Sequence, residues 1–170
     1  MDAIVSDTTA LIVLARRQRL DLLGACFERV LLPRAVYLEW LAGDASVEQT
    51  VASLGFLEVV EVDDSPLLGE LRMLLDPGEA EALALARAQG LPLLVDEKKG
   101  RTIARMMKIP VLGLVGVLLL AVERGILEPQ VAGALLQESI NHGFRLSERL
   151  HQAFLNRLAL SADPQMKSKT

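Results

Sequence analysis

Short runs of β-branched and aliphatic residues alternate with longer stretches of helical periodicity along most of the chain. The runs predict buried strands, which we expect at residues 3–6, 29–32, 56–62, 93–95 and 109–112. This alternation is typical of a parallel sheet with helices on both faces. We therefore expect an α/β fold, a three-layer α-β-α sandwich around a central, mostly parallel sheet.

Proline and glycine mark several helix ends. Pro33 suits the first turn of a helix, and Asp76, Pro77 and Gly78 break the chain before an Ala- and Leu-rich helix that Gly90 ends. We expect further helices at 19–25, 65–75, 98–108, 114–124, 129–142 and 147–160.

The length of 170 residues suits one domain, which we expect over 1–160, followed by a polar, disordered tail over 161–170. The single cysteine, Cys26, excludes an internal disulfide framework and favours a reducing, cytoplasmic setting. We expect no export leader and no membrane segment. The longest apolar run, 111–122, has twelve residues, whereas a spanning helix needs about 20.

Two of the predicted strands end in a carboxylate, at Asp7 and Asp96. In open α/β sheets, ligands bind outside the carboxyl ends of the strands. If these strands are neighbours, the two carboxylates lie close together, and a hard divalent cation would relieve their repulsion. Each aspartate could instead cap the helix that follows it.

Two further acids could complete such a site. Glu39 lies among apolar residues on a short helix, and Glu79 begins the helix after Asp76, Pro77 and Gly78. Glu39 could equally lie on a solvated face, and Glu79 could simply be stabilised at a helix N-terminus. Glu81 points to a different side of the helix from Glu79, so we expect only one of the two to be a direct ligand.

Basic residues crowd into the segment after Asp96, although the net charge of the chain is −4. They are Lys98, Lys99, Arg101, Arg105 and Lys108. Such a run is usually a solvated helix face. Next to a cluster of acids, it also fits a track for a phosphate backbone.

Taken in order, these motifs resemble those of the PIN domain, a Mg²⁺-dependent nuclease fold. The opening Val5-Ser6-Asp7-Thr8-Thr9 resembles the first motif, and Glu39 stands where the second acid belongs. The segment 78–86 (GEAEALALA), followed by 93–97 (LLVDE), resembles the third and fourth motifs. The resemblance reaches to about Leu158 and is closest to prokaryotic, virulence-associated-protein-C-like toxins with a GEAEA third motif.

The resemblance implies a metal-dependent endoribonuclease that hydrolyses RNA phosphodiester bonds with Mg²⁺ or Mn²⁺. The implied acids are Asp7, Glu39, Glu79 and Asp96, with Glu97 and Glu81 as possible additional metal ligands. Ser6, Thr8 and Thr9 would orient the ligands through hydrogen bonds. Lys98, Arg101 and Arg105 would meet RNA phosphates.

Many prokaryotic relatives are toxins of toxin–antitoxin pairs, so the resemblance also implies a small antitoxin partner and a homodimer. Two residues depart from the common pattern. The third acid is Glu79 rather than aspartate, and Val95 stands where many relatives have Ser or Thr, with Glu97 directly after Asp96. An alternative is therefore a catalytically idle PIN-fold module that binds RNA or protein.

Other enzyme classes fit less well. The turn after Asp7 lacks the second aspartate that a phosphatase of the dehalogenase type needs. No glycine-rich dinucleotide loop follows the first strand. The chain has no G-x-S-x-G element for a serine hydrolase.

Overall fold

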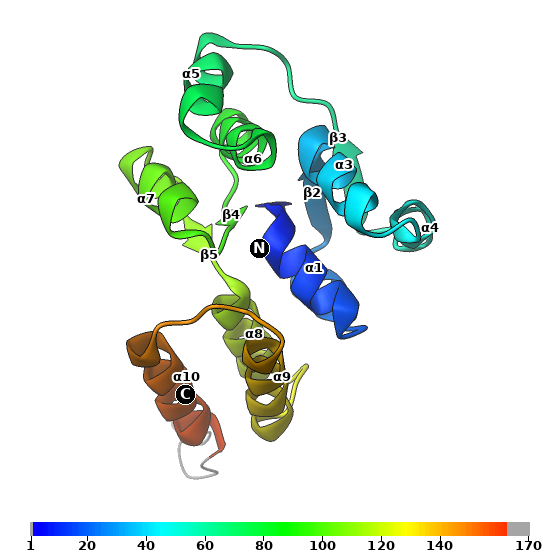
Figure 1. Cartoon of the computed structure of the whole chain (residues 1–170). Helices are drawn as coiled ribbons and strands as arrows, with labels where there is room; N and C mark the ends of the chain where they lie inside the picture. The colour runs from blue at the N-terminus through cyan, green and yellow to red at the C-terminus, as the bar shows by residue number, and fades with distance from the viewer. Residues whose placement is uncertain (1, 163–170) are drawn as a thin grey trace. The chain divides into compact units, whose positions relative to one another are not determined.

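The computed structural model describes residues 2–162 (Figure 1). The chain divides into two compact units, with the boundary between Leu114 and Val115. None of the helices within 2–162 is long and apolar enough to cross a membrane.

The strands of the first unit form one five-stranded sheet within the described residues, in the order β3-β2-β1-β4-β5. Every pairing is parallel, which confirms the expected fold class. The strands are β1 (Ala3–Ser6), β2 (Arg29–Pro33), β3 (Leu57–Val60), β4 (Leu93–Leu94) and β5 (Val111–Leu112). Because β1 and β4 are neighbours, Asp7 and Asp96 follow adjacent strands at the same edge of the sheet.

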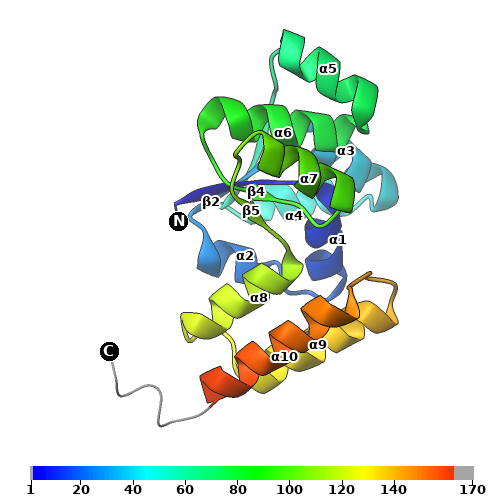
Figure 2. The same cartoon turned by 90° about the vertical axis from the view of Figure 1, so that its left-hand side faces the viewer.

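Helices connect these strands and cover the sheet. They are α1 (Thr8–Arg16), α2 (Asp21–Cys26), α3 (Arg34–Gly43), α4 (Val47–Ser53), α5 (Pro66–Leu74), α6 (Pro77–Gln89) and α7 (Lys98–Met106). Figure 2 shows α5, α6 and α7 on one side of the sheet and α1 and α2 on the other. The central strand β1 is buried along its whole length, as expected for a parallel strand covered on both faces.

The core beneath α5, α6 and α7 explains why these helices hold their places. Val5, Leu31 and Leu93 of the sheet pack with Leu68 and Leu71 of α5 in one buried cluster. The same cluster includes Ala104 of α7 and four alanines of α6, which are Ala80, Ala82, Ala84 and Ala86. Small residues let α6 lie close to the sheet, so the first turn of α6 comes near the end of β1.

The second unit is helical. It contains most of α8 (Leu114–Glu123), followed by α9 (Pro129–Asn141) and α10 (Glu148–Ala162). Ala132 and Leu136 of α9 and Phe154 and Leu158 of α10 are buried. An Arg157–Glu123 ion pair of 2.8 Å links α10 to α8.

Several details differ from expectation. The strands expected at 56–62, 93–95 and 109–112 are shorter, at Leu57–Val60, Leu93–Leu94 and Val111–Leu112. The sequence pattern missed α4, a short helix in which only Val47 is buried, so it lacks an apolar stripe. Pro33 is the last residue of β2 rather than the first turn of α3. The helix expected to end at residue 160 continues to Ala162, and the rest of the predicted tail, 163–170, lies outside the described residues.

Candidate active site

Asp7 lies at the end of the central strand and is almost fully buried. Its side chain is 5% exposed, and its backbone N–H donates to the carbonyl of Leu94 at 2.9 Å. It stands at the N-cap position of α1, yet within residues 2–162 its side chain makes none of the usual capping hydrogen bonds to the second or third residue of that helix. Capping therefore does not account for a buried carboxyl group at this point.

Burial raises the pKa of Asp7 from 3.8 to about 7. A hydrogen bond from the backbone of Thr8 opposes this rise, whereas the charges of Glu79, Asp76 and Glu39 add to it. The first strand thus delivers a carboxyl group into a poorly solvated position among other acids.

Glu39, on α3, lies close to residues of two other elements. The hydroxyl of Thr8 donates to Glu39 Oε2 at 2.9 Å. On α6, a methyl group at Gly78 would lie only 2.8 Å from the same oxygen. The lack of a side chain at Gly78 therefore lets the Glu39 carboxylate approach the first turn of α6.

Glu79 is the third residue of α6 and is 9% exposed. Asp76 caps this helix by accepting a hydrogen bond from the Glu79 backbone at 2.9 Å. Burial raises the pKa of the Glu79 carboxyl, and the charges of Asp76 and Glu97 add to the rise, while Lys99 opposes it. A methyl group at Gly100 of α7 would lie 3.1 Å from Glu79 Oε1, so this carboxylate points toward the start of α7.

Asp96 has a different set of partners. Its two carboxylate oxygens accept from the backbone N–H of Leu114 at 3.1 and 3.2 Å. Burial raises the pKa of Asp96 to about 6, against the opposing effects of the Leu114 N–H and of the Arg101 charge. A methyl group at Gly113 would lie 2.6 Å from Asp96 Oδ1 and 2.8 Å from an Arg101 nitrogen, so Gly113 makes room for both side chains.

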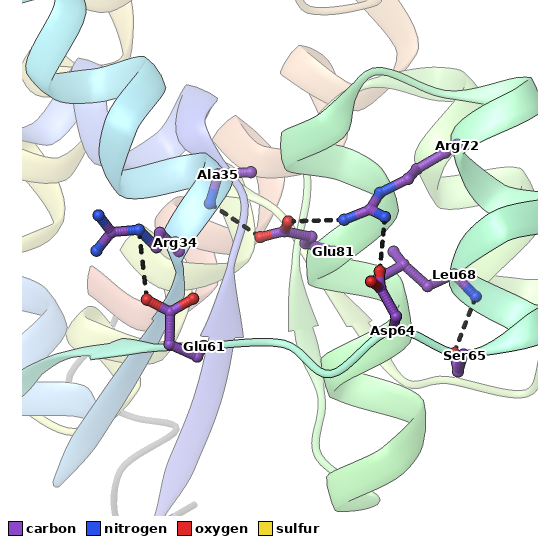
Figure 3. Close-up of polar contacts among 8 residues, drawn as sticks. All are labelled: Arg34, Ala35, Glu61, Asp64, Ser65, Leu68, Arg72 and Glu81. Carbon is purple, nitrogen blue, oxygen red and sulfur yellow. Dashed lines mark hydrogen bonds and ion pairs between the residues drawn. The ribbon is translucent and has the colours of Figure 1, made fainter.

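The remaining predicted acids lie apart from one another. Glu97 is exposed, and its charge acts on both Glu79 and Asp96. Glu81 points away toward α3 and α5, where its oxygens accept from the Ala35 backbone and from Arg72 (Figure 3).

The hydroxyl residues around Asp7 have separate roles. Ser6 is fully buried, and its hydroxyl donates to the carbonyl oxygen of Asp7 at 2.8 Å. Thr8 serves Glu39, as described above. Thr9 is partly buried in the first turn of α1.

The predicted RNA-binding residues differ in their exposure and in their partners. Lys98 and Arg105 are exposed on α7. Arg101 is partly buried and donates to the Val95 carbonyl at 3.1 Å, so its guanidinium is turned toward Asp96. Lys99 donates to the carbonyl of Leu74, which ties α7 to the end of α5.

The sequence of residues 3–159 matches the family model described as the PIN domain. The chain belongs to the PIN domain family. Members of this family are typically metal-dependent nucleases. Among solved structures, this PIN domain is similar to a PilT N-terminus domain protein from the hyperthermophilic archaeon Sulfolobus solfataricus P2. The two share 12% identity over 86% of this chain and 100% of the other, with a TM-score of 0.45. A comparison with curated proteins gives no match.

The donor set of this PIN domain fits Mg²⁺ or Mn²⁺ in its chemistry. The candidate ligands are carboxylate oxygens, which hard divalent cations prefer. A cation would also relieve the repulsion and poor solvation that raise the pKa of Asp7 and Glu79. In the part of the chain that the structure describes, no three His, Cys, Asp or Glu side chains are grouped closely enough to hold a metal ion.

Sequence reasoning missed two kinds of residue at this site. Asp76 caps α6 and adds to the negative charge near Asp7, a role that its position before Pro77 could have indicated. Gly78, Gly100 and Gly113 each face the carboxylate of a different acid. Their role depends on contacts between elements, so no local pattern signals it.

Proposed function

We propose that this PIN domain is a metal-dependent endoribonuclease, with Asp7, Glu39, Glu79 and Asp96 as its acidic residues. The burial of Asp7 among other acids, at the carboxyl end of the central parallel strand, supports this most directly. Because its pKa is raised, this carboxyl group destabilises the metal-free fold at neutral pH. Groups with such perturbed pKa values are typical of functional sites. Membership of the family also supports a nuclease function, because PIN domains are typically nucleases.

In this proposal, Asp7, Glu79 and Asp96 would hold Mg²⁺ or Mn²⁺. Glu97 lies close enough for its charge to act on Glu79 and Asp96, so it would add to the attraction for the cation. The bound metal would supply Lewis-acid activation of water and of the phosphate. Thr8 fixes the rotamer of Glu39, and Ser6 ties its hydroxyl to the Asp7 carbonyl. Lys98 and Arg105, exposed on α7, would hold the RNA backbone through charge.

Cleavage of a mixed RNA pool by purified protein with Mn²⁺ tests the nuclease proposal. We expect the wild type to cut, and Asp7→Asn and Asp96→Asn to be inactive while remaining folded by circular dichroism. EDTA should abolish cutting by the wild type, and added Mn²⁺ should restore it. Equal cutting by the wild type and both variants would contradict the proposal.

One observation favours the second candidate, an idle PIN-fold module that binds RNA or protein. The Arg101 guanidinium already lies beside Asp96, and the Leu114 N–H already occupies its oxygens. A protein of this kind would bind Mn²⁺ weakly and cut no RNA. Calorimetric titration of Mn²⁺ into wild type and Asp7→Asn separates the candidates, because only the nuclease requires tight binding that Asp7→Asn loses.

The toxin role, the antitoxin partner, the homodimer and the cytoplasmic setting belong to the same proposal and rest on the family resemblance. Induced expression in bacterial cells tests the toxin role, with growth arrest expected for the wild type and normal growth for Asp7→Asn. Sedimentation over a range of concentrations tests the homodimer. A species that stays monomeric at the highest concentration would remove it.

A further inference from the structure

The start of α3 is capped by a residue of α6, a helix that lies far away in sequence. The first N–H groups of any helix lack partners within that helix. Pro33, which precedes α3, carries no side-chain acceptor for them. Instead, Glu81 Oε2 of α6 accepts from the Ala35 backbone N–H at 2.9 Å, across 46 positions of sequence. Figure 3 shows the Glu81 carboxylate lying between Ala35 and Arg72.

The other oxygen of Glu81 is also engaged. Arg72 of α5 donates to Glu81 Oε1 at 3.3 Å and to Asp64 at 2.9 Å. The Glu81 side chain is 13% exposed, against 43% for Arg72 and 89% for Asp64. Glu81 is therefore the protected member of this network, and its carboxylate joins α3, α5 and α6 at one point.

This contact lies on the same helix faces as the candidate site. On α3, Glu39 follows Ala35 by four residues, and on α6, Glu81 follows Gly78 by three, so each pair shares a helix face. Gly78 is the residue that leaves room for Glu39 Oε2. The Glu81–Ala35 bond and the Glu39–Gly78 approach are two contacts of the same α3–α6 interface.

We propose that Glu81 is a positioning residue that sets where Glu39 lies, and that it is not a metal ligand. Glu81 holds the first turn of α3 against α6, and α3 then presents Glu39 to Thr8 and Gly78 one turn later. This inference rests on the proposed nuclease function, in which Glu39 serves the reaction.

A double-mutant cycle between Glu81 and Glu39 tests the proposal, with RNA cleavage and Mn²⁺ affinity measured on each protein. We expect Glu81→Ala to lower activity about tenfold, as loss of an orienting partner typically does. Glu81→Gln keeps a carbonyl oxygen for the Ala35 N–H and should recover most of that loss. In a Glu39→Gln background, Glu81→Ala should have little further effect, because both changes remove the same contribution.

Glu61→Ala is the matched control. It removes the 3.3 Å ion pair to Arg34, the first residue of α3, without touching the backbone bond to Ala35. We expect it to leave cleavage and Mn²⁺ affinity unchanged. All rates and affinities are measured well below the unfolding temperature of every variant. A lower activity then cannot result from a smaller fraction of folded protein.

Other outcomes would overturn the proposal. Equal losses from Glu81→Ala in the wild-type and Glu39→Gln backgrounds would show that Glu81 acts independently of Glu39, as a ligand or as a general stabilising residue. A normal cleavage rate in Glu81→Ala would give it a role in stability alone. A wild type that cuts no RNA overturns both the nuclease proposal and the role of Glu81, because Glu39 then serves no reaction. A wild type that cuts RNA, with Glu81→Ala cutting equally well, overturns the role of Glu81 alone.

Discussion

Thr8 donates its hydroxyl hydrogen to Glu39 Oε2 at 2.9 Å, which joins the residue after Asp7 to an acid 31 positions away. Thr8 is 4% exposed, whereas Glu39 is exposed. A buried donor thus fixes an acid that would otherwise be free to move.

Replacing Thr8 by valine removes this donor and keeps the shape of the side chain. We expect Thr8→Val to lower RNA cleavage about tenfold, because Glu39 loses the group that fixes its rotamer. Thr8→Ser keeps the hydroxyl and should remain close to wild type. Initial rates with Mn²⁺ measure both, and equal rates for the two variants would assign Thr8 to packing only.

The buried carboxyl of Asp7 predicts the pH dependence of the metal-free protein. Between the ordinary value of 3.8 and about 7, the folded protein holds a proton that the unfolded chain has released. The free energy of unfolding must therefore fall as pH rises through this interval. Asp96 and Glu79 add dependences of the same sign.

Urea unfolding in EDTA at several pH values measures this slope. We expect Asp7→Asn to flatten it and to be more stable than the wild type at neutral pH. A wild-type stability that rises with pH across the same interval would contradict the burial of Asp7.

Gly78→Ala should separate activity from stability. A methyl group there would meet Glu39 Oε2 at 2.8 Å. Because Glu39 is an exposed side chain that can swing away, the fold should tolerate the change. Gly78 is the second residue of α6, so alanine there gains at most the preference over glycine of about 0.5–1 kcal/mol that it has in a helix interior. We expect unchanged or higher thermal stability and activity lowered about tenfold.

Gly69→Ala in α5 is its control, because among the described residues a methyl group there meets no atom within 4 Å. Thermal unfolding and cleavage rates compare the two variants. Equal activity in both would mean that the approach of Glu39 to α6 has no functional role.

Asp96 combines its proposed catalytic role with a structural one, and two substitutions distinguish them. Asp96→Asn keeps a carbonyl oxygen that can accept from the Leu114 N–H, so the variant should stay folded and lose cleavage. Asp96→Ala removes the acceptor and should also lose about 1 kcal/mol of stability, the usual cost of deleting a cap. Chemical denaturation measures the difference. Equal stabilities would show that the Leu114 contact contributes little.

The basic residues of α7 should differ in their effects on RNA binding. Lys98→Ala with Arg105→Ala should weaken binding and reduce its salt dependence by about one unit of slope per lost phosphate contact. Arg101→Ala should leave that slope unchanged, because its guanidinium faces the Val95 carbonyl and Asp96.

Arg101→Ala should instead raise the pKa of Asp96 further and move the acidic limb of the rate profile to higher pH. Filter binding at several salt concentrations and a pH–rate profile test the two statements. A smaller salt slope in Arg101→Ala would place Arg101 on the RNA.

The sequence pattern predicted the fold because each strand is a local signal. The runs at 3–6 and 93–95 are short, largely apolar and followed by aspartate, so their burial could be inferred. The sequence placed Asp7 and Asp96 together only on the condition that these strands are neighbours, and the pairing of β1 with β4 meets that condition. The helix α4 escaped prediction because its segment is polar, with only Val47 buried.

The finer features of the site could not be inferred, because they depend on partners far away in sequence. Whether Glu81 faces the acids or the start of α3 is decided by how α3 packs on α6. The orientation of Arg101 toward Val95 likewise depends on the space left by Gly113. Charge counts along α7 cannot distinguish such an inward guanidinium from an exposed one.

The strand order has a consequence for synthesis of the protein. Among the strands of this sheet, β1 is made first, yet it lies in the middle of the sheet and pairs Val5 with Leu93. Until that later segment emerges, one edge of β1 has no partner, and pairing of such distant segments is slow. Asp96 finds its backbone partner only when Leu114 is made. A nascent chain therefore lacks the complete set of acids until Asp96 and Leu114 have both been made, so any nuclease activity would begin only after that point.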